Sequence, residues 1–97
     1  MKFYVYLLRC KDNSLYCGYT NDLLKRLDEH NNSKKGAKYT RGKRPVILVY
    51  FEEFDDKIDA QKREFEIKNF TKYEKEKLVM GFAVKFTVPQ NPTSLSP

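Results

Sequence analysis

The N-terminal half of the chain alternates between apolar runs and short polar breaks. Residues 3–9 and 15–20 are rich in aromatic and branched side chains, and the polar segment 12–14 separates them. Two such runs joined by a short polar break are typical of a β-hairpin. A third run over 46–51 is almost continuously apolar, which predicts a central strand covered on both faces. The pattern therefore predicts three strands.

Helical patterns occupy the remaining ordered sequence. One apolar stripe predicts a helix over about 22–31, and two more helices are expected over about 57–70 and 71–81. A polar side chain at the first position of each helix can accept backbone N–H bonds. The candidates for these caps are Asn21 or Asp22, Asp55 or Asp56, and Thr71.

The order β-β-α-β-α-α predicts an α+β domain, in which helices flank a small mixed or antiparallel three-stranded sheet. Residues 82–88 alternate apolar and polar side chains and predict a short extra strand. The segment from Pro89 onward is rich in Pro, Ser, Asn and Thr, which predicts disorder. We therefore expect one domain over residues 1–81 and a C-terminal extension over 82–97.

Composition describes a small globular protein. The 97 residues are 40% hydrophobic and 14% aromatic, enough for one core and one site. Cys10 and Cys17 have no second pair to complete a zinc set and are expected to be reduced thiols in or near the core. No run approaches the roughly 18 apolar residues of a membrane span, and no leader pattern opens the chain. These features predict a cytoplasmic protein that does not bind membranes.

Positive charge is concentrated in the first half of the chain. Residues 1–45 hold 11 Lys and Arg against 4 Asp and Glu, whereas residues 46–97 hold 8 against 9. A polar, glycine-containing loop over 33–44 carries most of this excess, which favours a polyanion such as nucleic acid. The alternative is a solvated loop that is basic only for solubility. The candidate nucleic-acid-binding residues are Lys34, Lys35, Lys38, Tyr39, Arg41, Lys43 and Arg44.

Two tripeptides give the chain a specific resemblance. Tyr4-Val5-Tyr6 and Tyr16-Cys17-Gly18 are separated by nine residues and resemble the paired signature of the GIY-YIG nuclease family. The resemblance continues with Arg26, His30 and Glu64 in the family order, and it covers residues 3 to about 80. The loop and the segment around Glu64 are most similar to small single-domain bacterial members.

The resemblance implies a metal-dependent phosphodiesterase that acts on nucleic acid, with DNA expected rather than RNA. Tyr6, helped by Tyr16 or His30, would activate water, and Arg26 would stabilise the anionic transition state. Glu64 would hold one divalent ion, Mg²⁺ or Mn²⁺. The alternative is a DNA- or RNA-binding module on the same fold without catalysis. The sequence leaves the oligomeric state open.

The residues support several of these roles independently of the family. Arg26 and His30 are spaced i, i+4 and share one helix face, although Asp22 could instead pair with Arg26. On a helical wheel Glu64 lies about 40° from Ala60, at the border of the apolar stripe. A carboxylate there needs a partner, which would be Arg26, Lys68 or a metal ion. Glu66, on the same helix, is expected to be a solvated charge.

Three further expectations concern the hairpin. Gly18 packs nothing inside a strand, which indicates a bulge or a close approach at the site. Tyr19 stands where related repair incision enzymes place a lysine, a change that either weakens proton abstraction or transfers that role to His30. For Tyr6 and Tyr16 to share a face with the other candidates, the turn must have an odd number of residues or contain a bulge, because side chains alternate with period two.

Overall fold

The computed structural model describes residues 1–87, with side chains described as far as residue 83. Its sheet contains three antiparallel strands in the order β2-β1-β3. The strands are β1 (Phe3–Arg9), β2 (Leu15–Thr20) and β3 (Ile47–Phe54). The predicted hairpin is confirmed, and the sheet is antiparallel throughout.

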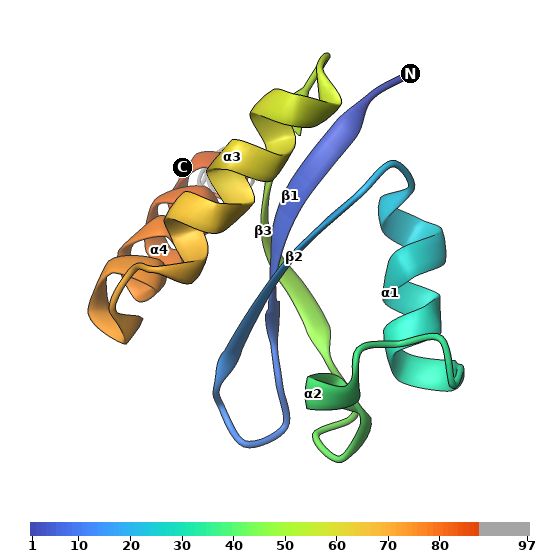
Figure 1. Ribbon diagram of the computed structural model, residues 1–97. Coiled ribbons are helices and arrows are strands. Elements are labelled where there is room, and N and C mark those ends of the chain that lie inside the picture. The colour runs from blue at the N-terminus through green and yellow to red at the C-terminus, as the bar shows by residue number, and fades with distance from the viewer. Residues whose placement is uncertain (88–97) are drawn as a thin grey trace.

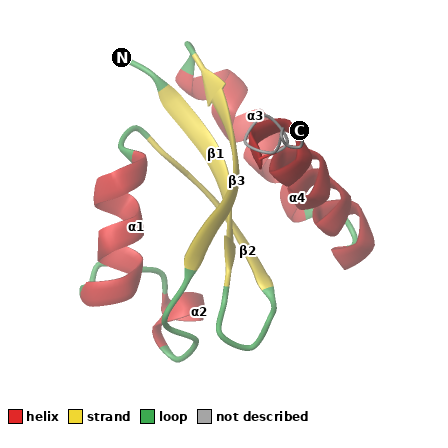
Figure 2. Ribbon diagram, turned by 180° about the vertical axis from the view of Figure 1, so that it is seen from behind, coloured by secondary structure: helices red, strands yellow, loops and turns green. Residues whose placement is uncertain are grey.

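Four helices surround the sheet. They are α1 (Leu23–Asn32), α2 (Lys38–Arg41), α3 (Lys57–Lys68) and α4 (Lys72–Thr87). Figures 1 and 2, seen from opposite sides, place α1 on one side of the sheet and α3 with α4 on the other. The predicted α+β class is confirmed. No helix of the described chain is long and apolar enough to cross a membrane.

Side-chain caps fix where two helices begin. Asp22 accepts the N–H of Lys25 at 3.1 Å and starts α1, and Asp56 accepts the N–H of Ile58 at 3.0 Å and starts α3. Each carboxylate satisfies a backbone donor that the first turn of a helix leaves free. Of the two capping candidates named for each helix, the second is the one that caps.

The hairpin register follows from an odd-numbered turn. Arg9 pairs with Leu15, and the N–H of Cys10 donates to Ser14 O at 2.9 Å, which leaves three residues at the tip. Asn13 adopts a positive φ of 70°, a conformation that asparagine tolerates better than most residues. The register between β1 and β2 is regular, so the expected odd turn is confirmed and Gly18 is not a bulge.

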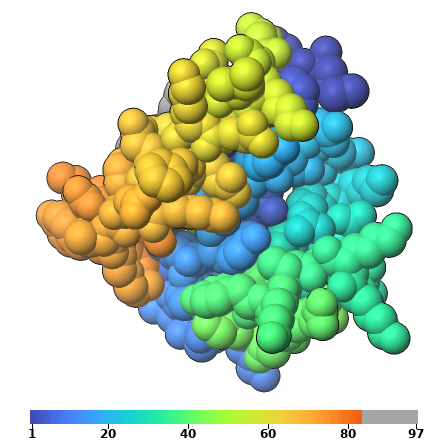
Figure 3. Space-filling view, in the orientation of Figure 1, coloured from blue at the N-terminus to red at the C-terminus, as the bar shows by residue number. Residues whose placement is uncertain are grey.

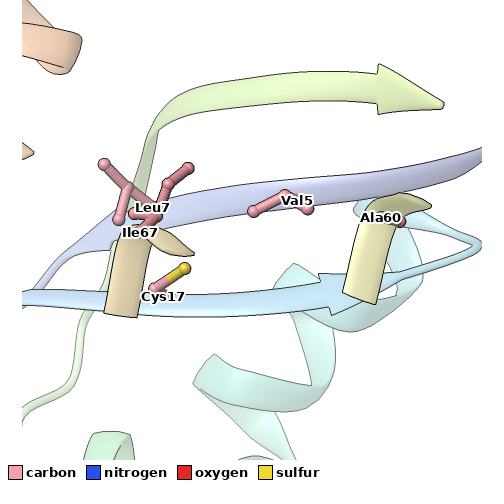
Figure 4. Packing of buried hydrophobic residues seen from close by; sticks show 5 residues of the cluster. All are labelled: Val5, Leu7, Cys17, Ala60 and Ile67. Atoms are coloured by element: carbon pink, nitrogen blue, oxygen red, sulfur yellow. The ribbon is translucent and has the colours of Figure 1, made fainter. Parts of the chain in front are cut away.

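The sheet separates two apolar clusters. Under α3 and α4, Val5, Leu7 and Cys17 pack against Ala60 and Ile67 (Figure 4). On the opposite face, the cluster beneath α1 contains buried Tyr6, Leu8, Cys10 and Val46, with Leu23 and Leu27 of α1 packed against them. Cys10 and Cys17 are both buried and free, in agreement with the expectation of reduced thiols.

The prediction that residues 46–51 form the central strand is wrong. β3 lies at an edge of the sheet and Ile47 is 61% exposed, whereas Val5 to Leu8 of β1 are buried and occupy the centre. The apolar run arises because both faces of β3 are partly covered: Leu48 and Phe51 join the cluster under α1, and neighbouring side chains join the other. A strand can therefore have both faces covered by side chains while only one of its edges pairs with another strand.

The strand predicted over residues 82–88 is also wrong for residues 82–87, which continue α4. The period-two alternation resembled a strand, but Phe82 lies one helical turn after Leu78. Its ring packs edge-on against Tyr50 and Phe51 of β3, at 5.5 and 5.3 Å between centroids. This contact supports a helix that runs through residue 81, the domain boundary predicted from sequence. The disorder expected from Pro89 onward lies outside the described residues.

Candidate active site

Tyr6 and Tyr16 project from the hairpin toward α1. Because Leu8 pairs with Tyr16 and lies two residues from Tyr6, the two tyrosines share one face of the sheet. Their ring centroids are 6.5 Å apart, and both rings contact His30 edge-on, at 5.9 and 5.2 Å. The structure therefore brings three of the expected site residues into one aromatic cluster.

His30 is fully buried at the end of α1, and both of its ring nitrogens have partners. Nε2 lies 2.8 Å from the hydroxyl of Tyr6, and Nδ1 lies 2.9 Å from the hydroxyl of Thr40. Burial, reinforced by the nearby Arg26 cation, lowers the pKa of His30 to about 4. His30 is thus neutral near pH 7, and one of its ring nitrogens is unprotonated and can accept a hydrogen bond.

Arg26 lies one helical turn before His30 and faces the same site. Its Nη1 donates to Glu29 at 2.9 Å and to the carbonyl of Lys35 at 2.8 Å, so α1 and the following loop hold the guanidinium in place. The pairing with Asp22 considered from sequence is replaced by this pairing with Glu29. Burial raises the pKa of Tyr6, and hydrogen bonding with Arg26 partly offsets that effect.

Glu64 approaches the site from α3, on the far side of β2. Its side chain is only 18% exposed, and its carboxylate pairs with Lys68 at 3.2 Å, one of the three partners proposed from sequence. The phenol of Tyr16 responds to charges on both sides: burial raises its pKa, Lys68 and Arg26 lower it, and Glu64 raises it. Glu66 is 61% exposed, as expected, but its carboxylate also pairs with Arg63.

Tyr6, Tyr16, Arg26 and His30 therefore gather on the α1 side of the sheet, whereas Glu64 lies on the α3 side, across β2. The expectation that all five residues share one face is wrong for Glu64, because α3 packs on the opposite face of the sheet from α1. In the space-filling view, the blue surface of β2 lies between yellow α3 and the cyan-to-green surface of α1 and the loop after it (Figure 3). Among the described residues, no three His, Cys, Asp or Glu side chains gather as a ready-made metal site. Any ion at Glu64 would therefore have one protein carboxylate and would rely on water and phosphate oxygens for its other ligands, which is how Mg²⁺ is often bound.

Gly18 makes room for the Tyr6 phenol, as anticipated. A Cβ at this position would lie 2.5 Å from Tyr6 Oη and 2.7 Å from Cζ. Tyr19, the residue in the lysine position, packs instead with the cluster under α3, and its hydroxyl lies 3.2 Å from the side-chain amide of Gln61. His30, by contrast, contacts Tyr6 directly.

The structure divides the basic candidates into two groups. Arg44 donates to the carbonyl of His30 at 2.6 Å and also to that of Ser33, so it closes the end of α1. Lys43 pairs with Asp12 at 3.3 Å and sits 3.6 Å above the Tyr39 ring. Among the basic candidates of this loop, the exposed side chains for which the described residues provide no ion pair are Lys34, Lys35, Lys38 and Arg41.

Tyr39 contacts the site through its ring. The ring stacks on Tyr16 at 5.7 Å and 27°, and the ammonium of Lys43 lies 3.6 Å from its centroid. Tyr39 is therefore part of the aromatic cluster. Lys43 and Arg44 likewise have structural partners, and their expected role in binding nucleic acid stays a prediction.

Sequence reasoning missed Thr40, which is fully buried against His30. It lies in α2, a four-residue helix inside the segment expected to be a loop. Helix periodicity connects positions three or four apart, and ten residues separate Thr40 from His30, so no local pattern links them. The sole signal in the sequence was a threonine of modest polarity among strongly charged neighbours.

Several known proteins are similar to this chain in sequence. A family model described as the GIY-YIG catalytic domain matches residues 2–77. A UPF0213 protein of Clostridium perfringens is 55% identical over 82 residues, which cover 84% of this chain and 87% of that protein. A UPF0213 protein of Staphylococcus saprophyticus is 55% identical over 78 residues, 80% of this chain and 94% of its own length.

Two solution NMR structures are similar as well. One is a UPF0213 protein of Bacillus halodurans, with 48% identity, a TM-score of 0.54, and coverage of 82% of this chain and 84% of that one. The other is a protein of E. faecalis, with 43% identity, a TM-score of 0.59, and coverage of 87% and 88%. With the family model matching most of its length, the chain belongs to the GIY-YIG family.

Proposed function

We propose that this protein is a divalent-metal-dependent phosphodiesterase that cleaves nucleic-acid strands, as an endonuclease in DNA repair or processing. Family membership supports a nuclease-like role. The observation that carries the catalytic part is the buried hydrogen bond of 2.8 Å between Tyr6 Oη and His30 Nε2. A neutral histidine beside a phenol provides a proton acceptor next to a group that can itself accept a proton from water.

In the proposed reaction, water attacks the phosphorus of a phosphodiester. A bond forms between the water oxygen and phosphorus, and the bond from phosphorus to the leaving oxygen breaks. The proton of the water passes to Tyr6 as the phenol passes its own proton to His30 Nε2. Solvent protonates the leaving oxygen. Because burial raises the pKa of Tyr6, this exchange avoids a free phenolate in the site.

Charge in the transition state is balanced by Arg26 and the Glu64 site. The guanidinium of Arg26 is fixed by two hydrogen bonds and can stabilise charge on the phosphate oxygens. The part-buried carboxylate of Glu64 would hold one Mg²⁺ or Mn²⁺, with Lys68 released from its ion pair. When bound, the ion would polarise the scissile phosphate.

The exposed basic side chains of the loop after α1 would hold the strand. They would contact phosphates without reading bases, which carries no sequence preference. DNA rather than RNA is the strand in this proposal. We also place the reaction in the cytoplasm, because two buried thiols that form no disulfide suit a reducing compartment.

Glu64→Gln tests the catalytic proposal directly. The change keeps the volume and removes the anionic ligand, so we expect cleavage to fall at least 100-fold, within the range of ~10²–10³ known for losing one preorganised charge-stabilising group. Folding and nucleic-acid binding should persist. The assay incubates parent and variant with structured DNAs and RNAs in Mg²⁺, Mn²⁺ or chelator. Glu66→Gln is the matched control, because it makes the same change on an exposed face of α3.

A binding module without catalysis is the second candidate, favoured by the ion pair that Glu64 already makes with Lys68. Under that alternative, Glu64→Gln leaves a lysine unpaired and lowers stability slightly, since Lys68 is half exposed. Parent protein that binds strands but shows no metal-stimulated cleavage of any substrate would decide for the binding module.

A further inference from the structure

Both ring nitrogens of His30 are committed to hydroxyl groups, so their hydrogen atoms can be assigned. A hydroxyl carries a single hydrogen and donates once. Thr40 Oγ1 lies 2.9 Å from the carbonyl oxygen of Ala37, which can only accept, and 2.9 Å from His30 Nδ1. If Thr40 donates to the carbonyl, it must accept from Nδ1, and His30 then carries its proton on Nδ1.

The other end of the imidazole gives the same assignment. Tyr6 is buried, and its hydroxyl lies 2.8 Å from Nε2 of His30. A buried hydroxyl needs an acceptor for its hydrogen, and an unprotonated Nε2 provides one. The opposite tautomer would direct the Nε2–H at the Tyr6 oxygen, and the hydroxyl hydrogen could then no longer bond to His30. The N–H of Ala37 is directed at Nδ1 from 3.4 Å and favours the opposite tautomer, in which Nδ1 accepts. It is the longest contact of the set, and the assignment rests on the two shorter contacts with hydroxyl groups.

We propose that Thr40 is a positioning residue, which holds His30 in the tautomer protonated at Nδ1 and thereby leaves Nε2 free to accept the proton of Tyr6. The group that fixes one imidazole nitrogen determines what the other can do. The consequence for cleavage rests on the proposed function, whereas the tautomer itself does not.

The loop is built to keep Thr40 in place. At Gly36, a Cβ would lie 2.8 Å from the Cα of His30, so the loop backbone is pressed against α1 at this residue. Arg44 bonds the His30 carbonyl from the other end of the loop. Between these two contacts, the N–H of Thr40 donates to Ala37 O at 3.1 Å and fixes the turn that carries the hydroxyl. Two contacts of the loop thus hold it against His30, and the third fixes the turn that carries the Thr40 hydroxyl.

The experiment uses the fact that the chain contains one histidine. Long-range proton–nitrogen NMR of ¹⁵N-labelled protein near pH 7 reports which ring nitrogen is protonated, without any substrate. We expect Nδ1–H in the parent and in Thr40→Ser, which keeps the hydroxyl. In Thr40→Val, which removes it at constant shape, we expect a substantial Nε2–H population and a fall in kcat of roughly 10- to 100-fold, part of the ~10²–10⁴ that proton transfer contributes.

Thr71→Val is the matched control, because it removes a hydroxyl that caps α4, 3.1 Å from the N–H of Glu74, and leaves His30 untouched. It should lower stability without changing the tautomer. Nε2–H in the parent, or the same tautomer in Thr40→Val as in the parent, would overturn the proposal. If Thr40→Val does not fold, the parent and Thr40→Ser spectra still decide. Failure of the proposed function would appear separately, as Nδ1–H in a parent that cleaves nothing.

Discussion

At the residue scale, the site depends on side chains that fit one another closely. The tyrosines, Arg26 and His30 could be named from sequence because the family spacing marks them, and their contacts follow from the hairpin register and the i, i+4 spacing on α1. Thr40 could not be named, because its contact with His30 requires the path of the loop. What sequence cannot supply at this scale is the partner of each polar group.

Replacing Gly18 should disturb the site through contact alone. In Gly18→Ala, the new methyl would lie 2.5 Å from Tyr6 Oη, so the ring must move and the bond to His30 should break. We expect a loss of about 1–3 kcal/mol in stability, the usual cost of overpacking, and a changed NMR signal for His30 Nε2. Gly42→Ala is the control, because its Cβ meets nothing within 4 Å. Equal melting temperatures for the two variants would contradict this account.

The buried state of His30 predicts a pH dependence of stability. Its pKa is lowered to about 4 in the folded protein, against about 6.5 in an unfolded chain. The unfolded state therefore binds more protons between these values, so stability is complete above about pH 6.5 and falls as pH decreases toward 4. The difference should approach about 3 kcal/mol at 1.36 kcal/mol for each pKa unit.

His30→Gln separates the contribution of His30 to this pH dependence from that of the carboxylates, which also titrate. Denaturant unfolding of parent and variant, measured from pH 4 to 8, should give a stability difference that shrinks steadily as pH falls. A difference that stays constant across this range would show that His30 does not titrate with a lowered pKa.

At the element scale, hydrophobic patterns predicted where most strands and helices lie along the chain. They did not predict the order of the strands in the sheet. The run at 46–51 predicts the central strand, but β1 holds the centre, because strand order depends on which edges pair and a single sequence does not encode that directly. The alternation after residue 81 gave way to helix because Phe82 packs against β3. In both cases a tertiary contact decided what the local pattern left open.

The basic residues of the loop after α1 should differ in function. The exposed ones should bind nucleic acid, and Arg44 should stabilise the fold. Changing Lys34, Lys35, Lys38 and Arg41 together to glutamine should weaken nucleic-acid binding about equally for all sequences. It should also reduce the slope of log K against log salt by about 0.9 for each duplex phosphate that the protein no longer neutralises. Melting temperature should barely change, because these side chains are exposed.

The control for that variant has the same charge change elsewhere, at Lys57, Lys62, Lys75 and Lys77. Arg44→Gln alone should behave in the opposite way, because it removes the bonds that close α1 and should lower the melting temperature. If the loop variant and the control variant bind equally well at two salt concentrations, the loop is only a solubilising surface.

At the scale of the whole molecule, the site lies across the sheet. α1 and its loop supply Arg26 and His30 from one face, α3 supplies Glu64 from the other, and β2 separates them. The sequence predicted that these residues belong together, through the family order, but not that they approach from opposite faces. The site therefore requires the two layers of helices to stay fixed on one sheet.

One ion-pair cluster fastens α4 to the hairpin and should matter to the whole fold without touching the site. Arg9 of β1 makes a two-point contact with Glu76 of α4, at 2.6 Å through Nη2, and Lys72 pairs with the same carboxylate at 3.0 Å while donating to Asn13 O at 2.9 Å. Arg9 and Glu76 are 23% and 31% exposed, so water screens them only in part. These cations lower the pKa of Glu76 to about 2.

Glu76→Gln should therefore lower stability by about 1.5–3 kcal/mol, the usual value for hydrogen bonds to a charged group, and melting temperature by several degrees. Glu53→Gln is the control, because its pair with Lys2 is half exposed and should be worth less than about 1 kcal/mol. The advantage of the parent over Glu76→Gln should be complete above about pH 4.5 and decline as pH falls toward 2, since the folded protein resists protonation there. The NMR signals of His30 should stay unchanged, because the cluster lies away from Tyr6 and Thr40. Two results would contradict this separation of the fold from the site. One is a Glu76→Gln variant with the same melting temperature as Glu53→Gln, and the other is a Glu76→Gln variant in which the NMR signals of His30 change.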